Sequence, residues 1–370
     1  MNPNLNTRQL HDLGQRLWLD NITRDLLRSG MLSHYIAEFS VTGLTSNPTI
    51  FDHAIGSGNA YDDAIRALVA QGLSTEDIFF ELALEDLTQA ADLFRPMFDA
   101  SAGTPSGSDG WVSLEVSPLL ANDTARTTQA AARLHARAAR PNLFIKIPGT
   151  PEGIPAIEQS IFDGVPINVT LLFSREQYEA AAAAYLRGIE RRVKAGLDPS
   201  VESVASLFVS RWDVAVREDL QPQLQNRLGI AVAMQTYQAY RDLLASERWQ
   251  VLAAAGARPQ RLLWASTGTK DPAVSDTLYV EALAATGTIN TIPEKTLLAY
   301  ADHGKAGSIL PADGGYAQAV LQEFRREGVD DQALAARLQR EGVQSFTKSW
   351  SGLMARIREK GAQPTLVNPA

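Results

Sequence analysis

Short apolar runs recur along the chain and alternate with longer amphipathic segments. Runs this short, closed by a proline or a polar residue, are typical of strands buried on both faces. The longer segments place apolar residues at helical spacing and charges on the opposite face, which predicts helices. Eight segments have the strand pattern, at residues 17–21, 41–48, 111–118, 142–150, 165–173, 203–209, 261–266 and 286–293.

Eight strands that alternate with helices predict an α/β protein, a single (β/α)8 or TIM barrel rather than an open sheet. The length of 370 residues fits one such barrel with extensions. We expect one domain over residues 1–362, which includes additional C-terminal helices at about 294–362, and a disordered tail at 363–370.

The last predicted helix carries an apolar stripe of Phe346, Trp350, Leu353 and Ile357. Because these positions share one helical face, we expect the helix to pack against the outside of the barrel or across its mouth. Such an extension can act as a lid or as an oligomer contact, for example in a homodimer.

Two further helix predictions rest on local signals. The apolar spacing from Ile50 to Gln71 predicts one helix. Pro272 suits the first turn of a helix that runs to Ala285, with Asp271 as its cap.

One lysine interrupts the fourth apolar run. Lys146 stands between Ile145 and Ile147. Burial of an unpaired amine is costly and favours its neutral form, which is a nucleophile. Lys146 is therefore a candidate for Schiff-base formation with a carbonyl. The alternative is a lysine that reaches water at the strand end or forms an ion pair there.

In this fold the active site lies at the C-terminal ends of the strands. Polar residues recur at those ends: Asp20, Asn47, Glu115, Lys146, Asn168, Thr170, Ser206 and Ser266, with Lys270 nearby. Lys146 with two carboxylates, Glu115 and Asp20, supplies the nucleophile and the proton-transfer groups that imine chemistry requires.

Each of these polar residues also has an ordinary structural alternative. Thr170 and Ser206 also fit the role of satisfied core groups. Asp20 also fits a helix N-cap for the segment that starts at Ile22. The role of a satisfied core group is less attractive for Glu115, because carboxylates are almost never fully buried without a partner.

Phosphate binding is the second candidate chemistry. Arg211 follows the sixth strand, and Ser266 to Lys270 follow the seventh, where barrel enzymes often hold phosphate. A solvated turn and a surface arginine are the alternative.

Composition and charge disfavour several classes of function. The formal net charge is −8 and the basic residues are dispersed, which disfavours nucleic-acid binding. No run has the length of a membrane span and the first residues lack a signal-peptide core, so we expect no membrane contact and a cytoplasmic location. The chain has no cysteine, its five histidines are scattered and no strand leads into a Gly-rich phosphate loop. We therefore expect no metal and no cofactor.

Several motifs, taken in order, resemble those of the transaldolase family over most of the chain. They are Leu19-Asp-Asn21, Thr45-Ser-Asn-Pro-Thr49, Ser113-Leu-Glu-Val116, Ile145-Lys-Ile-Pro-Gly-Thr150, Ile167-Asn-Val-Thr-Leu-Leu-Phe-Ser174 and Ser206-Leu-Phe-Val-Ser-Arg211. The resemblance implies a metal-free Schiff-base enzyme of the pentose phosphate pathway. Such an enzyme moves a dihydroxyacetone unit from sedoheptulose 7-phosphate to glyceraldehyde 3-phosphate, and yields erythrose 4-phosphate and fructose 6-phosphate.

The resemblance also implies residue roles. Lys146 forms the imine and Asp20 takes the C4 hydroxyl proton. Glu115 transfers protons through a water positioned with Thr170. The implied sugar and phosphate contacts are Asn47, Asn168, Ser206 and Arg211, and Lys270 is expected to replace a second phosphate-binding arginine as a point charge.

Within this resemblance, the residue at position 208 distinguishes transaldolases from related aldolases, and here it is Phe208. Related fructose 6-phosphate aldolases carry a tyrosine here, whereas the apolar ring of Phe208 offers no proton to the carbanionic intermediate. This favours transfer over simple cleavage. The alternatives are a fructose 6-phosphate aldolase-like enzyme and a non-catalytic barrel that binds sugar phosphates.

Overall fold

The computed structural model describes residues 3–219, 221–269, 271 and 273–362. Eight parallel strands close into a barrel in chain order, and β1 pairs with β8 to complete it. The strands are β1 Arg16–Leu19, β2 Val41–Thr45, β3 Trp111–Glu115, β4 Leu143–Pro148, β5 Ile167–Leu172, β6 Ser203–Phe208, β7 Gln260–Ala265 and β8 Ile289–Ile292. The predicted (β/α)8 barrel is confirmed.

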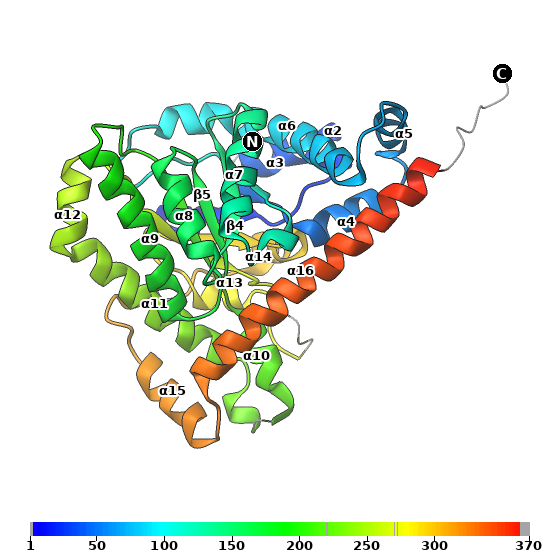
Figure 1. Cartoon of the computed structure of the whole chain (residues 1–370). Coiled ribbons are helices and arrows are strands. Elements are labelled where there is room, and N and C mark those ends of the chain that lie inside the picture. Colours follow the sequence, from blue (N-terminus) through cyan, green and yellow to red (C-terminus); the bar gives the residue numbers. More distant parts are fainter. Residues whose placement is uncertain (1–2, 220, 270, 272, 363–370) are drawn as a thin grey trace.

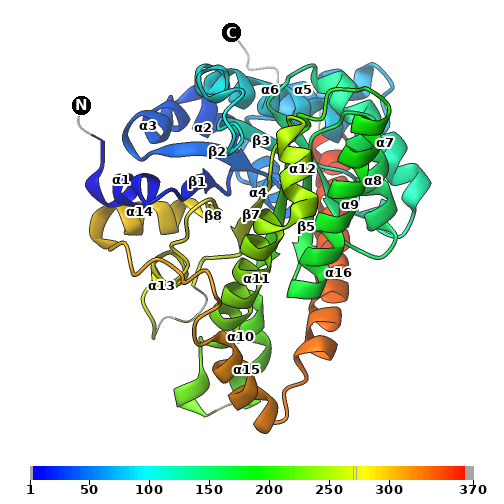
Figure 2. The ribbon, with the colours of Figure 1, turned by 90° about the vertical axis from the view of Figure 1, so that its left-hand side faces the viewer.

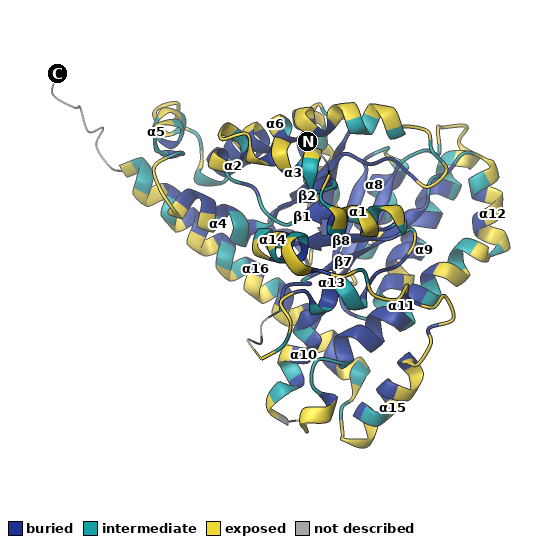
Figure 3. Cartoon of the chain, turned by 180° about the vertical axis from the view of Figure 1, so that it is seen from behind, coloured by how far each residue is buried: buried dark blue, intermediate teal, exposed yellow. Residues whose placement is uncertain are grey.

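Helices surround this barrel and link its strands (Figure 1). They are α1 Leu5–Asp12, α2 Arg24–Arg28, α3 Met31–Glu38, α4 Pro48–Gly56, α5 Asp62–Ala70, α6 Thr75–Ser101, η1 Pro118–Leu120, α7 Thr124–Ala138, α8 Gly153–Phe162, α9 Arg175–Lys194, α10 Ser210–Val216, η2 Arg217–Asp219, η3 Pro222–Leu224, α11 Leu228–Ala245, α12 Glu247–Ala254, α13 Leu278–Ala282, α14 Glu294–His303, α15 Ala317–Arg326 and α16 Asp331–Ala362. Figure 3 shows the barrel strands buried and the exposed residues on the outer faces of the helices. Each strand is covered by helices on its outer face and by the barrel interior on its inner face, which explains why the strands are continuous apolar runs in the sequence.

The strand register brings three polar residues to one level of the barrel. Glu115 of β3 is the register partner of Lys146 of β4, and Lys146 is in turn the partner of Asn168 of β5. Neighbouring residues in register point to the same side of a sheet. The register alone therefore gathers these side chains from three consecutive strands.

The long helix α16 crosses the barrel mouth. Figures 1 and 2 show it reaching from the region of α10 and α15 to that of α5. The side-chain nitrogen Nε2 of Gln339 donates to the carbonyl oxygens of Gly149, at 2.9 Å, and Leu171, at 3.0 Å. These carbonyls lie at the ends of β4 and β5, so α16 is fixed to the C-terminal rim.

The apolar stripe of α16 is buried as predicted. Phe346, Trp350, Leu353 and Ile357 all lie in the hydrophobic core. The assignment of one domain over residues 1–362 stays a prediction, and the expected tail at 363–370 lies outside the described residues.

The single helix predicted from Ile50 to Gln71 is wrong, because the chain forms α4 and α5 with a break between them. The break allows two tertiary contacts: Arg24 donates to the carbonyl oxygen of Ala60 at 3.3 Å, and the buried Tyr61 hydroxyl donates to Asp86 at 2.7 Å. Tertiary contacts override the helical spacing here.

The helix predicted from Pro272 to Ala285 is also wrong. Pro272 lies outside the described residues, and among the described residues from Ala273 to Ala285 the helical part is only α13, Leu278–Ala282. Oδ1 of Asp271 accepts a hydrogen bond from the backbone nitrogen of Ala273 at 2.9 Å. This local turn competes with a helix start.

Candidate active site

A cavity of about 250 Å³ opens at the C-terminal ends of the strands. Many of the residues predicted for the site line it: Asp20, Asn47, Lys146, Thr170, Ser206, Phe208, Arg211 and Ser266. Asn168 and Glu115 are buried beside this cavity rather than in its lining, and Lys270 lies outside the described residues. Side chains that the sequence did not indicate also line it, among them Thr45, His53, Thr291 and Phe346.

Lys146 lies at the floor of the cavity and has close partners. Its Nζ donates to the carbonyl oxygen of Ser46 at 2.9 Å and lies 3.3 Å from Oε2 of Glu115. Only 5% of Lys146 and 6% of Glu115 is exposed. Of the alternatives, the structure excludes a lysine that reaches bulk water. It also corrects the premise of an unpaired amine, since a carboxyl group stands beside it.

Burial raises the pKa of Glu115 above its ordinary value. The nearby charge of Lys146 opposes this rise, and the carboxylate of Asp20 adds to it. A carboxyl group that holds its proton more readily than usual is suited to proton transfer near neutral pH.

The carboxylate of Asp20 lies at the end of a hydrogen-bonded chain of two threonine hydroxyl groups. The Thr45 hydroxyl donates to Oδ1 of Asp20 at 2.7 Å, and Oγ1 of Thr291 lies 2.6 Å from Oγ1 of Thr45. Because Thr45 gives its only proton to Asp20, Thr291 must donate to Thr45. Asp20 is not the N-cap of the next helix, since Thr23 accepts a hydrogen bond from the backbone nitrogen of Leu26 at 3.0 Å.

Asn168 lies in a polar layer inside the barrel. Its Nδ2 donates to the Ser113 hydroxyl at 3.1 Å, and its Oδ1 accepts from the Ser206 hydroxyl at 2.7 Å. The Thr170 hydroxyl, which is also buried, has no hydrogen-bond partner among the described residues. An unpaired buried hydroxyl is uncommon and indicates a site for water or substrate.

Asn47 has a structural contact as well as a place in the cavity. Its Oδ1 accepts a hydrogen bond from the backbone nitrogen of Ile50 at 3.0 Å and caps α4. The cap uses the amide oxygen, so the amide N–H groups of Asn47 are its means of binding a ligand.

The far end of the cavity carries a cation. Cζ of Arg211 lies 5.4 Å from the ring centroid of Phe208. Burial lowers the pKa of Arg211 from its usual range, and the charge of Glu341 on α16 opposes this change. Next to it, Ser266 has a left-handed backbone (φ 55°), and its hydroxyl oxygen lies 2.9 Å from that of Ser210. The arrangement offers a guanidinium and hydroxyl groups to an anion.

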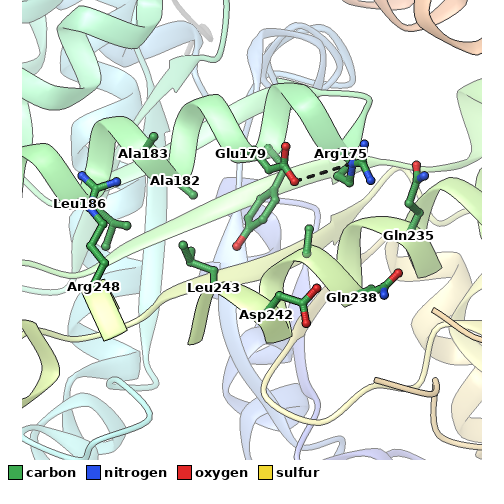
Figure 4. A pocket seen from close by; sticks show the side chains of 12 residues that line it. Arg175, Glu179, Ala182, Ala183, Leu186, Gln235, Gln238, Asp242, Leu243 and Arg248 are labelled. Carbon is green, nitrogen blue, oxygen red and sulfur yellow. Dashed lines mark ion pairs between the residues drawn. The ribbon is translucent and has the colours of Figure 1, made fainter. Parts of the chain in front are cut away.

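A second cavity, of about 330 Å³, lies between α9 and α11 on the outer wall of the barrel (Figure 4). Arg175 and Glu179 on its rim form an ion pair with 3.7 Å between Nε and Oε1. Although this cavity is larger, it contains none of the residues predicted for catalysis. We therefore place the chemistry in the barrel mouth.

An amine beside carboxyl groups in the mouth of a (β/α)8 barrel defines a class of site suited to carbonyl chemistry through an imine. Comparison with known proteins identifies the family within this class. The family model "Transaldolase/Fructose-6-phosphate aldolase" matches residues 17–357, and the chain belongs to this family.

Curated relatives are similar to this chain over nearly its whole length. A transaldolase of Thermobifida fusca is 45% identical over 367 residues, which span 97% of this chain and 99% of the relative. A transaldolase of Thiobacillus denitrificans is 46% identical over 359 residues, or 95% and 99% of the two chains. A transaldolase of Saccharopolyspora erythraea is 44% identical over 367 residues, or 97% and 99%. The resemblance to transaldolases is thereby confirmed.

Two other observations concern ligands and membranes. In the part of the chain that the structure describes, no cluster of three or more His, Cys, Asp or Glu side chains could hold a metal ion. No helix there is both long enough and apolar enough to cross a membrane. The expected absence of a cofactor stays a prediction.

Proposed function

We propose that the protein is a transaldolase that transfers a dihydroxyacetone unit from sedoheptulose 7-phosphate to glyceraldehyde 3-phosphate. The products are erythrose 4-phosphate and fructose 6-phosphate. The observation that carries the proposal is the buried Lys146 amine, 3.3 Å from the Glu115 carboxyl group at the floor of a cavity that also holds Asp20 and Arg211.

Imine formation is the first step. The Lys146 nitrogen adds to the C2 carbonyl of the ketose to give a carbinolamine, which loses water to form a protonated imine. Glu115 transfers the protons of this dehydration, and its raised pKa suits that role. The buried Thr170 hydroxyl, unpaired within the described residues, supports the assignment of a bridging water to it.

Cleavage of the C3–C4 bond follows. Asp20 accepts the proton of the C4 hydroxyl group as this bond breaks, and the electron pair moves into the imine to give an enamine. The aldehyde product, erythrose 4-phosphate, leaves. The hydrogen bond from Thr45 fixes the carboxylate of Asp20 for this step.

Transfer reverses these steps with a new aldehyde. The enamine carbon attacks the carbonyl carbon of glyceraldehyde 3-phosphate, and Asp20 returns its proton to the new C4 hydroxyl group. Hydrolysis of the imine then frees fructose 6-phosphate and the Lys146 amine. Phe208, with its apolar ring in the cavity, offers no proton to the enamine carbon while it waits for the acceptor.

The remaining side chains bind the substrate. Asn47, Asn168 and Ser206 contact the dihydroxyacetone part, and Arg211 with Ser266 binds the phosphate. Lys270 adds a second positive charge to the phosphate site. No cofactor or metal is needed, because the protonated imine itself accepts the electron pair.

The partners we propose are sugar phosphates alone, with neither nucleic acid nor membrane. We further propose a cytoplasmic location, because such charged metabolites do not cross bilayers unaided. The exposed side of α16 is free to serve as a homodimer contact, which analytical ultracentrifugation would test.

Product analysis separates this proposal from its alternatives. The protein is incubated with sedoheptulose 7-phosphate, with and without glyceraldehyde 3-phosphate. A transaldolase forms fructose 6-phosphate only with the acceptor present and releases little free dihydroxyacetone. An aldolase releases dihydroxyacetone in both cases, and a binding protein forms neither product.

A further inference from the structure

One aromatic side chain separates two cavities in the barrel mouth. Phe346 of α16 lines the substrate cavity, together with Lys146 and Asp20. It also lines a much smaller cavity of about 10 Å³, whose lining includes Glu115 and Leu171. The ring therefore forms a wall between the sugar and a space beside the Glu115 carboxyl group.

The position of this wall is fixed by neighbouring residues on α16. Gln339, Val343 and Phe346 follow at spacings of four and three, so they lie on one helical face. Gln339 is hydrogen-bonded to the rim of the barrel, through the carbonyl oxygen of Leu171 at 3.0 Å. Gly342 permits the close approach, because a Cβ atom there would lie 2.9 Å from Cδ2 of Leu171.

The small cavity has room for about one water molecule. It adjoins Glu115, whose Oε2 is buried and lies 3.3 Å from Nζ of Lys146. A water here would lie beside the group that transfers protons, and the ring of Phe346 stands between this space and the substrate cavity.

We propose that Phe346 is a positioning residue that keeps this water-sized cavity apart from the sugar cavity and so protects the bound three-carbon unit from hydrolysis. The inference rests on the proposed transaldolase function. The inference follows from the place of Phe346 in both cavity walls.

The reaction that Phe346 suppresses is loss of the donor unit. The enamine carbon takes a proton from water, which gives the protonated imine of dihydroxyacetone. The first water is left as hydroxide, and it takes the proton that a second water releases on adding to the imine carbon. A proton then moves from the carbinolamine hydroxyl group to the nitrogen as the carbon–nitrogen bond breaks. The products are free dihydroxyacetone and the Lys146 amine. Exclusion of water is a recognised way to prevent such side reactions.

The test compares Phe346→Ala with Phe346→Leu and with Leu353→Ala. Leu353 is a fully buried residue of the same helix and lines neither cavity, so it controls for loss of packing. The readout is the ratio of free dihydroxyacetone to fructose 6-phosphate formed from sedoheptulose 7-phosphate and glyceraldehyde 3-phosphate. We expect Phe346→Ala to raise this ratio roughly tenfold, Phe346→Leu less, and Leu353→Ala not at all.

The lifetime of the intermediate gives a second readout. The unmodified protein and each variant are loaded with sedoheptulose 7-phosphate in the absence of acceptor, and the imine is trapped with borohydride after increasing delays. The Phe346 variants should lose the trapped adduct faster than Leu353→Ala does. If Phe346→Ala does not fold, Phe346→Leu still decides the result by both measurements.

The outcomes separate this inference from the function it rests on. A lower overall rate with an unchanged product ratio and adduct lifetime in both Phe346 variants would overturn the role of Phe346. Absence of transfer by the unmodified protein would overturn the proposed function instead.

Discussion

Nζ of Lys146 lies 3.3 Å from Oε2 of Glu115, and both side chains are buried, Lys146 in the lining of the substrate cavity and Glu115 beside it. The pair arises from the register of β3 and β4. Because the carboxyl group stands next to the nucleophile, it is placed to accept and return the protons of imine formation.

The pH dependence of the reaction should therefore report Glu115. The pKa of Glu115 is raised by burial from its ordinary value of 4.5, so the ionised carboxylate that acts as a base forms at higher pH than in an exposed glutamate. We expect kcat/KM to rise with pH along an acid limb that lies above pH 4.5. Glu115→Gln should lower activity strongly and remove the limb. An acid limb unchanged in Glu115→Gln would assign it to another group.

Thr45 should affect catalysis through Asp20. Its hydroxyl donates to the carboxylate at 2.7 Å, and a hydrogen bond to a charged group contributes about 1.5–3 kcal/mol. We expect Thr45→Val to lower kcat by about tenfold or more, with little change in KM. Thr45→Ser keeps the hydroxyl group and should retain most of the activity. Equal losses in the two variants would show that the effect does not follow the hydroxyl group, and would contradict this role of the hydrogen bond.

Arg211 should affect phosphate binding more than chemistry. Arg211→Gln removes the guanidinium at the far end of the cavity, and KM for phosphorylated sugars should rise about 10- to 100-fold. With the donor at saturating concentration, the KM for the unphosphorylated acceptor glyceraldehyde should change little, and this serves as the control. Equal loss with both acceptors would argue against a phosphate contact.

A buried cluster behind the loop that carries Asp20 gives a stability prediction. The Tyr61 hydroxyl donates to Asp86 at 2.7 Å, and both residues are buried. Tyr61→Phe should lower the free energy of unfolding by about 1–3 kcal/mol, because it leaves the buried carboxyl group short of a donor.

The matched control for this change is Tyr300→Phe. Tyr300 is also buried, but its hydroxyl has no hydrogen-bond partner among the described residues. Its removal should leave stability unchanged or raise it. Denaturant unfolding of the two variants compares them directly, and an equal loss in both would contradict the prediction.

The strands were predictable because their signal is local. Runs such as Leu143 to Pro148 are apolar at almost every position, since a parallel strand covered on both faces needs no polar side. The signal for the helix expected from Pro272 was local as well, but the turn at Asp271 competed with it.

The candidate site was predictable where residues follow strand ends. In a (β/α)8 barrel the C-terminal ends of all strands meet at one rim, so Lys146, Glu115 and Asp20 are brought together independently of the loop conformations. The sequence predicted burial of Phe346 but not its place in the substrate cavity. That contact depends on how α16 crosses the mouth, which is set by Gln339 and the rim carbonyls rather than by any nearby motif.

The most direct test of the central claim is to trap the imine. The protein is incubated with fructose 6-phosphate, reduced with borohydride and digested, and the modified peptide is identified by mass spectrometry, with Lys146→Arg as the control. We expect a dihydroxyacetone-sized adduct on Lys146, absent from Lys146→Arg and discharged when erythrose 4-phosphate is added before reduction. Turnover without an adduct, or an adduct on a different lysine, would contradict the account.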